Sequence, residues 1–296
     1  MKYRISHETE YRYTVPVDVG QNQVTLRPRD IPRQRCLDHT LDIEPSPSTT
    51  NVRTDYFGNA TVLFNVQLPH TRMIVTSVSD VEVNPSPEDS PESSPPWEDI
   101  RAAVRGDRSP AGLQALQFVF DSPLIRTAPA LTAYAAESFT AGRPVLAATR
   151  ELTHRIFTDF KYDPTTTTVS TPVDEVFTLR SGVCQDFAHL QIAMLRGLGL
   201  PTRYVSGYLR TFKRDGDPKL IGADASHAWL SVFDGTGDPE TGWTDFDPTN
   251  NQVPGEHHVT VAWGRDYADV SPVKGVIVGG GEHTIDVRVE VKPIDR

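Results

Sequence analysis

One cysteine of this 296-residue chain lies where a loop gives way to a helix, a position that favours thiol chemistry. Cys184 follows Ser181-Gly182-Val183 and opens the helical apolar pattern of residues 184–198. The first turn of a helix presents unpaired N–H groups and the positive end of the helix dipole, so a thiolate there is stabilised. The same N–H groups can bind the oxyanion of a tetrahedral intermediate, and Gly182 would let the backbone approach a substrate carbonyl. These features predict a nucleophilic Cys184, with a buried core cysteine as the alternative.

A nucleophilic cysteine needs a base, and the base needs a partner that fixes its tautomer. His227 opens an apolar strand directly after a polar loop, and Asp247 ends a second strand 20 residues later. A hairpin of these two strands would bring the carboxylate beside the imidazole. Asp245 shares a strand face with Asp247, because side chains repeat every two residues, and is the alternative partner. We predict Cys184, His227 and Asp247 as a catalytic triad.

The remaining cysteine and histidines carry weaker signals. Cys36 has no helix start beside it and is expected to be structural. His189 lies five residues after Cys184, which places it about 140° around the helix, so we expect a packed histidine. His257 and His258 lie in a polar loop and are expected at the surface.

A metal site is the alternative use of these residue types. His227, Asp245 and Asp247 could combine with Cys184, but zinc would require a tighter motif and a second histidine at short spacing. We therefore expect no metal and no other cofactor.

The elements that must position these residues fall into two regions. Alternating strands are expected at 3–15, 38–44, 60–66 and 73–83, which predicts an N-terminal antiparallel β-sandwich over residues 1–83. Residues 84–98 are rich in proline, serine and glutamate and are predicted to be a linker.

Helical patterns begin after this linker. Helices are expected at 113–120, 129–138, 143–160 and 184–198, and strands at 202–209, 227–233, 243–247 and 284–291. In the fourth helix an apolar stripe ends at Gly197 and Gly199, where a helix should stop. Helices followed by antiparallel strands predict the α+β class, with a catalytic domain over residues 99–296.

Composition limits the partners and the compartment. The net charge is −10 and the pI about 5.4, so we expect no nucleic-acid partner. We also expect no membrane partner, because no segment approaches the roughly 20 apolar residues that span a bilayer. The first residues lack the apolar core of a secretion signal, so a cytoplasmic location with two free thiols is expected.

The chain resembles the bacterial transglutaminase-like superfamily, whose fold belongs to the papain-like cysteine enzymes. The resemblance covers nearly the whole chain apart from the linker, and the matching segments are 181–189, 199–208, 226–229, 243–250 and 264–272. Residues 2–59 resemble the β-sandwich domain that precedes such catalytic domains.

The resemblance implies Cys184 as the nucleophile, His227 as the general base and acid, and Asp247 as the residue that orients the histidine. The tryptophan that stabilises the oxyanion in the animal crosslinking enzymes has no counterpart, because the only upstream tryptophan is Trp97. Tyr162 or Gln185 are alternative donors. The acidic loop of the animal calcium sites is also missing, which agrees with an enzyme that needs no metal.

These residues predict an acyl-enzyme mechanism on a peptide or protein substrate. A thioester on Cys184 would be hydrolysed by water or transferred to an amine, and both outcomes use the same side chains. Water needs no dedicated site, so we expect hydrolysis of amide or peptide bonds, with protein-glutamine transamidation as the alternative. A catalytically inactive protein-binding module is a second alternative, against which the complete trio argues.

Overall fold

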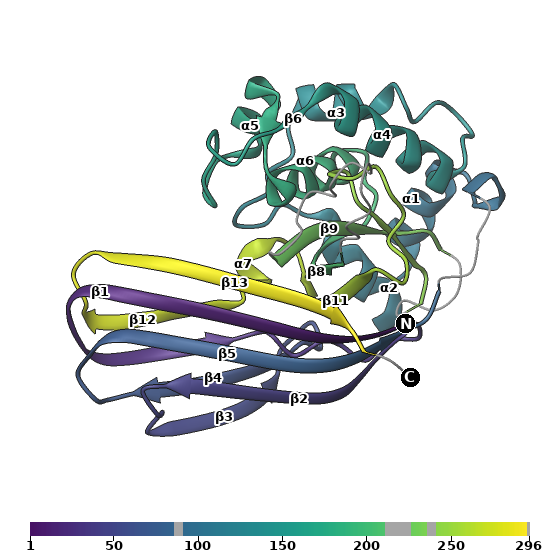
Figure 1. Cartoon of the computed structure of the whole chain (residues 1–296). Helices are drawn as coiled ribbons and strands as arrows, with labels where there is room; N and C mark the ends of the chain where they lie inside the picture. The colour runs from purple at the N-terminus through teal and green to yellow at the C-terminus, as the bar shows by residue number, and fades with distance from the viewer. Residues whose placement is uncertain (86–90, 211–225, 236–240, 295–296) are drawn as a thin grey trace, which may run out of the picture.

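The computed structural model describes residues 1–85, 91–210, 226–235 and 241–294. A large antiparallel sheet forms one side of the molecule, and helices packed around a smaller sheet form the other (Figure 1). The α+β class predicted from the order of the patterns is confirmed. None of the described helices has the length and apolar character that crossing a bilayer requires.

The large sheet is organised around one long strand, β1 (Lys2–Val24). Five strands follow the order β2-β5-β1-β4-β3, and β12 and β13 also pair with β1. Their bounds are β2 Gln34–Glu44, β3 Thr49–Thr54, β4 Ala60–Val66, β5 His70–Val83, β12 Val273–Gly279 and β13 His283–Pro293.

The sheet curls because β1 changes partners halfway along its length. Its first half, Tyr3–Tyr13, lies between β5 and β13, whereas its second half, Val17–Val24, pairs with β4 and β12. The curled sheet encloses an apolar core that contains Tyr13, Val17 and Phe64. The predicted sandwich is thus built from a continuous sheet that folds over itself.

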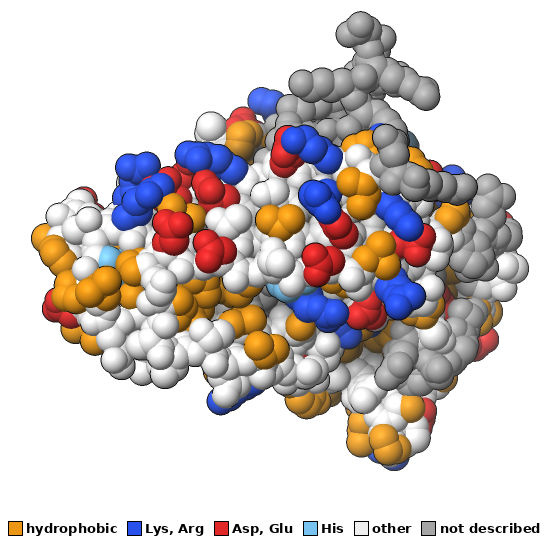
Figure 2. Space-filling model, turned by 60° about the horizontal axis from the view of Figure 1, so that its bottom comes forward, with side chains coloured by type: hydrophobic (Ala, Val, Ile, Leu, Met, Phe, Trp, Pro, Cys, Tyr) orange, Lys and Arg blue, Asp and Glu red, His pale blue; other side chains and the backbone are white. Residues whose placement is uncertain are grey.

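Charged side chains cover part of the outer surface of this sheet. Arg4 pairs with Asp80 at 2.6 Å, and Arg288 pairs with Glu8 at 3.0 Å, in each case across neighbouring strands. Figure 2, in which the bottom of Figure 1 comes forward, shows Lys and Arg interleaved with Asp and Glu. The two signs of charge therefore offset each other locally on that face.

The helical side of the molecule surrounds α6. Its helices are α1 Trp97–Gly106, α2 Pro110–Leu116, α3 Pro129–Ala136, α4 Val145–Asp159, α5 Val173–Leu179, α6 Cys184–Gly197 and α7 Tyr267–Val270, with short 3-10 turns at Pro91–Ser93 and Gln117–Val119.

The smaller sheet follows the order β10-β9-β8-β11 and is antiparallel throughout. Its strands are β8 Thr202–Leu209, β9 Ser226–Phe233, β10 Trp243–Phe246 and β11 His258–Gly264. A parallel pair, β6 Lys161–Tyr162 and β7 Ser181–Gly182, leads into α6.

The predicted division at 84–98 does not separate two independent cores. The catalytic domain was assigned the whole of 99–296, but β12 and β13 lie in the sheet of the N-terminal region. One apolar cluster also joins Tyr3 and Val83 of that sheet to the helices around α6. The composition of residues 84–98 can be read locally, and it predicts the polar linker. The pairing of β12 and β13 with β1 joins residues far apart in the sequence, so a local pattern does not predict it.

Candidate functional site

Cys184 is the first residue of α6, as the sequence predicted. The preceding Val183 has extended dihedral angles, and its carbonyl accepts the first helical bond from Phe187 at 3.0 Å. The helix ends at Gly197, and Gly199 adopts a positive φ of 83°, which an L side chain rarely tolerates. The thiol is half-buried, and the helix behind it is buried on nearly all sides rather than along one stripe.

Asp186 fixes the start of α6 and explains the glycine before the cysteine. Its Oδ2 accepts hydrogen bonds from Val183 N at 2.8 Å and from Thr167 Oγ1 at 2.6 Å. A Cβ built on Gly182 would lie 2.6 Å from this oxygen. Gly182 is therefore required for close packing against the Asp186 carboxylate, a reason that differs from the access to substrate expected from sequence.

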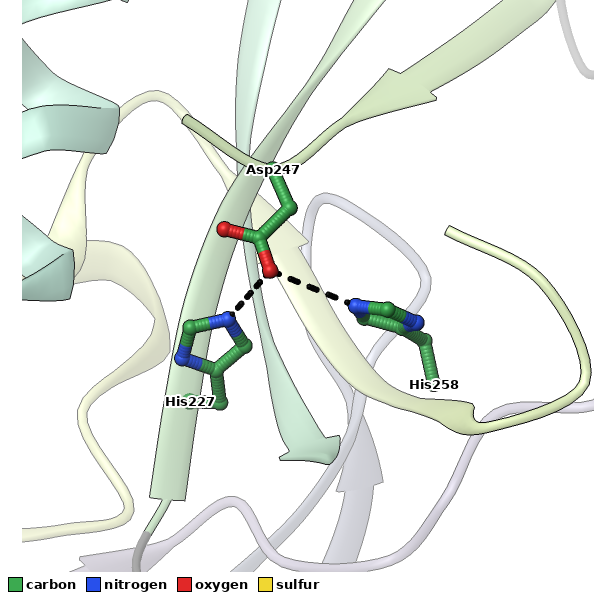
Figure 3. A group of neighbouring side chains, drawn as sticks. All are labelled: His227, Asp247 and His258. Atoms are coloured by element: carbon green, nitrogen blue, oxygen red, sulfur yellow. Dashed lines mark hydrogen bonds and ion pairs between the residues drawn. The ribbon is translucent and has the colours of Figure 1, made fainter. Parts of the chain in front are cut away.

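His227 lies near the start of β9, and its side chain is fully buried. Its Nε2 donates to Asp247 Oδ2 at 2.8 Å, and Figure 3 shows Nδ1 on the ring side turned away from that carboxylate. Nδ1 is buried and makes no hydrogen bond of ordinary length to a described residue. The Cys184 thiol is nevertheless close enough to interact with the ring.

Asp247 follows the last residue of β10 and is held in a tight turn. Its Oδ1 accepts from the backbone N–H groups of Thr249 at 2.9 Å and Asn250 at 3.2 Å. Its Oδ2 accepts from His227, from Asn250 Nδ2 at 2.8 Å, and from His258 Nε2 at 3.4 Å. A carboxylate with this many donors is stabilised in its ionised form although it is buried.

The two charges of the pair support each other. Burial alone would lower the pKa of His227, but Asp247 and the Cys184 thiol outweigh it and raise this pKa to about 10. Burial alone would raise the pKa of Asp247, but His227 and His258 outweigh it and hold this pKa below its usual range. The arrangement favours a protonated imidazole next to the Cys184 sulfur.

The expectation that His258 lies at the surface is wrong. His258 is the first residue of β11, its exposed fraction is 2%, and its Nε2 points at the same oxygen of Asp247 as that of His227 (Figure 3). Burial lowers the pKa of His258, so the ring is a neutral donor to the carboxylate at pH 7. Sequence reasoning missed it because the pairing of β11 with β8 is what carries it inward.

Asp245, the alternative partner of His227, faces other groups. It contacts Ser231 Oγ and forms an ion pair with Arg33 at 3.1 Å. The metal set of His227, Asp245, Asp247 and Cys184 considered from sequence is therefore not assembled.

A different acidic and histidine cluster, His227, Asp247 and His258, brings its ligand atoms within 4.8 Å of one another. A tetrahedral zinc with bonds of about 2.0–2.1 Å holds its ligand atoms roughly 3.3 Å apart. The 2.8 Å separation of His227 Nε2 and Asp247 Oδ2 is shorter and has the length of a hydrogen bond. These atoms fit a proton between them better than a metal ion.

The other predicted residues lie as follows. His189 is buried, and its Nε2 accepts from Tyr267 N at 3.2 Å, as expected of a packed histidine. Cys36 is half-buried in β2. Gln185 donates its side-chain amide to Val169 O at 3.0 Å, which occupies it, whereas Tyr162 is near enough to Cys184 for the thiol to affect it. Burial, with Cys184 and Asp186 adding to it, raises the pKa of Tyr162.

Two family models match this chain. Residues 3–82 match the bacterial transglutaminase-like N-terminal region, and residues 132–248 match the transglutaminase-like superfamily. An uncharacterized protein of Mycobacterium tuberculosis is 42% identical over 301 residues, covering 99% of this chain and 93% of its own length. The chain belongs to the transglutaminase-like superfamily.

This superfamily member is also similar in sequence to a second bacterial protein and in fold to a solved structure. A protein-glutamine gamma-glutamyltransferase of Pseudomonas aeruginosa is 31% identical over 103 residues, which cover 32% of this chain and 15% of that protein. A solved structure from Cytophaga hutchinsonii, described as a candidate cysteine protease, is similar in fold with a TM-score of 0.76. It is 24% identical, and the match covers 100% of this chain and 91% of that one, so the fold extends over the whole transglutaminase-like chain.

Proposed function

We propose that this protein is a cysteine-dependent acyl-transfer enzyme that forms a thioester on Cys184 and hydrolyses amide or peptide bonds. The observation that carries the proposal is the buried His227–Asp247 pair, with the thiol at the start of α6 close enough to raise the pKa of His227. In this proposal Cys184 is the nucleophile, His227 is the base, and Asp247 is the carboxylate that orients the histidine during covalent acyl transfer.

The first half of the reaction forms the acyl-enzyme. Nδ1 of His227 takes the proton from Cys184, and the thiolate attacks the amide carbonyl carbon to form the C–S bond. N–H groups of the first turn of α6 stabilise the oxyanion. When the tetrahedral intermediate collapses, the C–N bond breaks and Nδ1 gives its proton to the leaving amine. Asp247 keeps the ring oriented and stabilises the imidazolium throughout.

The second half releases the acyl group. Nδ1 takes a proton from water, the oxygen attacks the thioester carbon, and the C–S bond breaks to return the thiolate and release a carboxylic acid. Water is present in vast excess and needs no binding site of its own, which favours hydrolysis. A reducing compartment would keep both cysteines as free thiols, so we propose a cytoplasmic location.

Transamidation is the second candidate. It is favoured by one observation, the match of 103 residues to a protein named a protein-glutamine gamma-glutamyltransferase. In that case an amine would take the place of water in the second half, with the same three side chains.

The decisive experiment is intact mass spectrometry after incubation with a peptide pool in water enriched in oxygen-18, with and without an added primary amine. We expect an acyl adduct on Cys184 and a product carboxylate that carries the heavy oxygen. Incorporation of the amine instead would identify a transamidase. No adduct on the wild type, at any pH at which the protein stays folded, would support the inactive binding module, and Cys184→Ala provides the blank.

A further inference from the structure

A groove of about 1710 Å³ lies behind the turn that holds Asp247. Phe246 and Gln252 of that turn line it, together with the N-terminal loops 29–33 and 55–58 and residues of α4, whereas Cys184 and His227 are not among its lining residues. Small-molecule sites usually enclose about 300–1,000 Å³. The size of this groove instead suits a segment of polypeptide.

Arg203 of β8 lines this groove between two tryptophans. Its guanidinium carbon lies 3.8 Å from the ring centroid of Trp263 and 4.4 Å from that of Trp243. Both indoles therefore lie within cation–π distance of the same guanidinium. Arg29 stacks on Trp263 as well, at 3.5 Å. The result is an ordered cation–aromatic stack across the wall of the groove.

Arg203 forms no salt bridge with a described carboxylate, and its charge lies against the two tryptophans and within electrostatic reach of Asp245. The residue is 93% buried, with an exposed fraction of 7%, and its Nε has no hydrogen-bond acceptor in the part of the chain that the structure describes. A buried cation without an acceptor is costly, since a charged group normally enters a protein interior only when it is paired. Burial lowers the pKa of Arg203, which Asp245 partly opposes. An arginine nevertheless stays charged at neutral pH.

Four described carboxylates line the groove, and each has a partner other than Arg203; Glu256, for example, lies 3.7 Å from His257. Asp245 is bound by Ser231 and Arg33, although it lies in the same row of the sheet as Arg203. Asp55 caps its own turn by accepting from Phe57 N and Asn59 N, both at 2.8 Å. Asp30 accepts from Cys36 N at 2.8 Å. Among the residues that the structure describes, none of these carboxylates forms a salt bridge with Arg203, so a carboxylate of a ligand would be the first to do so.

The chemistry of the Arg203 guanidinium restricts what can bind it. A guanidinium carries its N–H donors in one plane. A carboxylate matches this fork with two parallel hydrogen bonds, and a phosphate can do the same. A neutral amide offers a single acceptor oxygen and no charge.

The net charge of −10 opposes the approach of an anion but does not decide its binding. At physiological ionic strength exposed charges are screened beyond about 8 Å. A charge-assisted hydrogen bond made within a partly buried wall acts at contact distance and is screened much less. The described wall of the groove carries four arginines and four carboxylates, so it does not share the net negative charge of the chain.

We propose that this groove is a binding site for an acidic peptide segment, with Arg203 as the residue that takes one of its carboxylates. The site is separate from the triad: Ser231, the neighbour of Arg203 across the sheet, lies four residues along β9 from His227, roughly 13 Å in a strand. Binding does not require the thiol, so it is testable even if the proposed enzymatic function fails.

The test is a titration of tryptophan fluorescence in the full-length Cys184→Ala protein, because Trp243 and Trp263 flank Arg203. The probes are N-acetyl tetraglutamate amide, the corresponding tetraglutamine amide, and inorganic phosphate, each at constant ionic strength. We expect saturable binding of the glutamate peptide and at least about tenfold weaker binding of the glutamine peptide. Arg203→Gln should weaken binding of the glutamate peptide by at least about tenfold, to the level of the glutamine peptide.

The matched control is Arg150→Gln, which removes one positive charge from an exposed position that also lines the groove. It should change the affinity by less than about threefold, because an exposed charge contributes little. Equal weakening by both substitutions would overturn the assignment to Arg203. Equal binding of the two peptides, or no effect of Arg203→Gln, would overturn the site.

Two further outcomes decide the proposal. Phosphate that binds as tightly as the glutamate peptide and displaces it completely would make this a site for free anions and contradict a peptide ligand. If Arg203→Gln fails to fold, judged by circular dichroism, Arg203→Lys keeps the charge without the planar fork. It should bind the glutamate peptide at least about fivefold more weakly than the arginine does, and undiminished binding would contradict the proposal.

Discussion

Nε2 of His227 donates a hydrogen bond to Oδ2 of Asp247 at 2.8 Å, and both side chains are completely buried. The bond joins the start of β9 to the turn after β10, although the residues are 20 positions apart. The pair leaves Nδ1 of the imidazole for the thiol at the start of α6.

Asp247→Asn should remove most of the activity, whereas Asp245→Asn should not. We expect kcat to fall by about 10³–10⁴ in Asp247→Asn, because an amide can hold the imidazole in the wrong tautomer. Asp245→Asn should leave kcat within about threefold and reduce stability by about 1–3 kcal/mol, through its contacts with Arg33 and Ser231. Steady-state kinetics and denaturant unfolding of both variants measure this, and a reversed order of kcat would refute the assignment of Asp247.

Iodoacetamide should alkylate Cys184 at least about tenfold faster than Cys36 at pH 7. Burial raises the pKa of Cys36, so this thiol is the slower reference within the same molecule. Peptide mapping by mass spectrometry gives both rates in one sample. His227→Gln should bring the rate of Cys184 toward that of Cys36, and equal, slow alkylation of both thiols in the wild type would count against an activated nucleophile.

The His227 imidazolium should stabilise the fold at neutral pH and stop doing so in alkali. Its pKa in the folded state is raised to about 10, above the unfolded value of about 6.5. The stabilisation is therefore complete below about pH 6.5 and is lost as the pH rises through about 10. Between pH 6 and pH 10 the wild type should lose more unfolding free energy than His227→Gln, and identical pH dependences would contradict the raised pKa.

Chelators should leave activity unchanged, and His258→Gln should reduce it by about tenfold. His258 supplies one of the hydrogen bonds that hold Asp247, and a hydrogen bond to a charged group contributes about 1.5–3 kcal/mol. Activity is measured after dialysis against EDTA and after addition of zinc. Inactivation by EDTA, with recovery on adding zinc, would assign the cluster of His227, Asp247 and His258 to a metal instead.

The parts of the fold with strong local patterns could be predicted from sequence. The boundaries of β4 and β8 agree with the predicted ranges, and α6 begins at the predicted residue, because alternation and a helix start are local properties. The helices α1, α5 and α7 and the strands β3, β6, β7, β11 and β12 were not predicted. Of these, α5 has only seven residues, and β3 is exposed along its whole length, so that it lacks an alternating pattern.

In the candidate site, too, residues with a local sequence signal could be predicted, whereas residues brought in by tertiary contacts could not. Cys184, His227 and Asp247 each carry a local signal, namely a helix start, a strand start and a turn before proline. Asn250 and His258 complete the surroundings of Asp247, but His258 reaches it only through tertiary pairing. Arg203 reads in sequence as an ordinary strand residue, and its burial between two tryptophans follows from the packing of β8, β10 and β11.

Strand β1 of the large sheet is synthesised long before one of the strands with which it pairs. Its first half pairs with β13, the last strand of the chain, from Tyr3↔Pro293 to Tyr13↔His283. Ribosomes elongate at about 5–20 residues per second, so roughly 14–54 s separate the synthesis of Tyr13 from that of its partner His283. Until then the edge of β1 that later pairs with β13 carries unpaired backbone groups, which can pair with a strand of another chain.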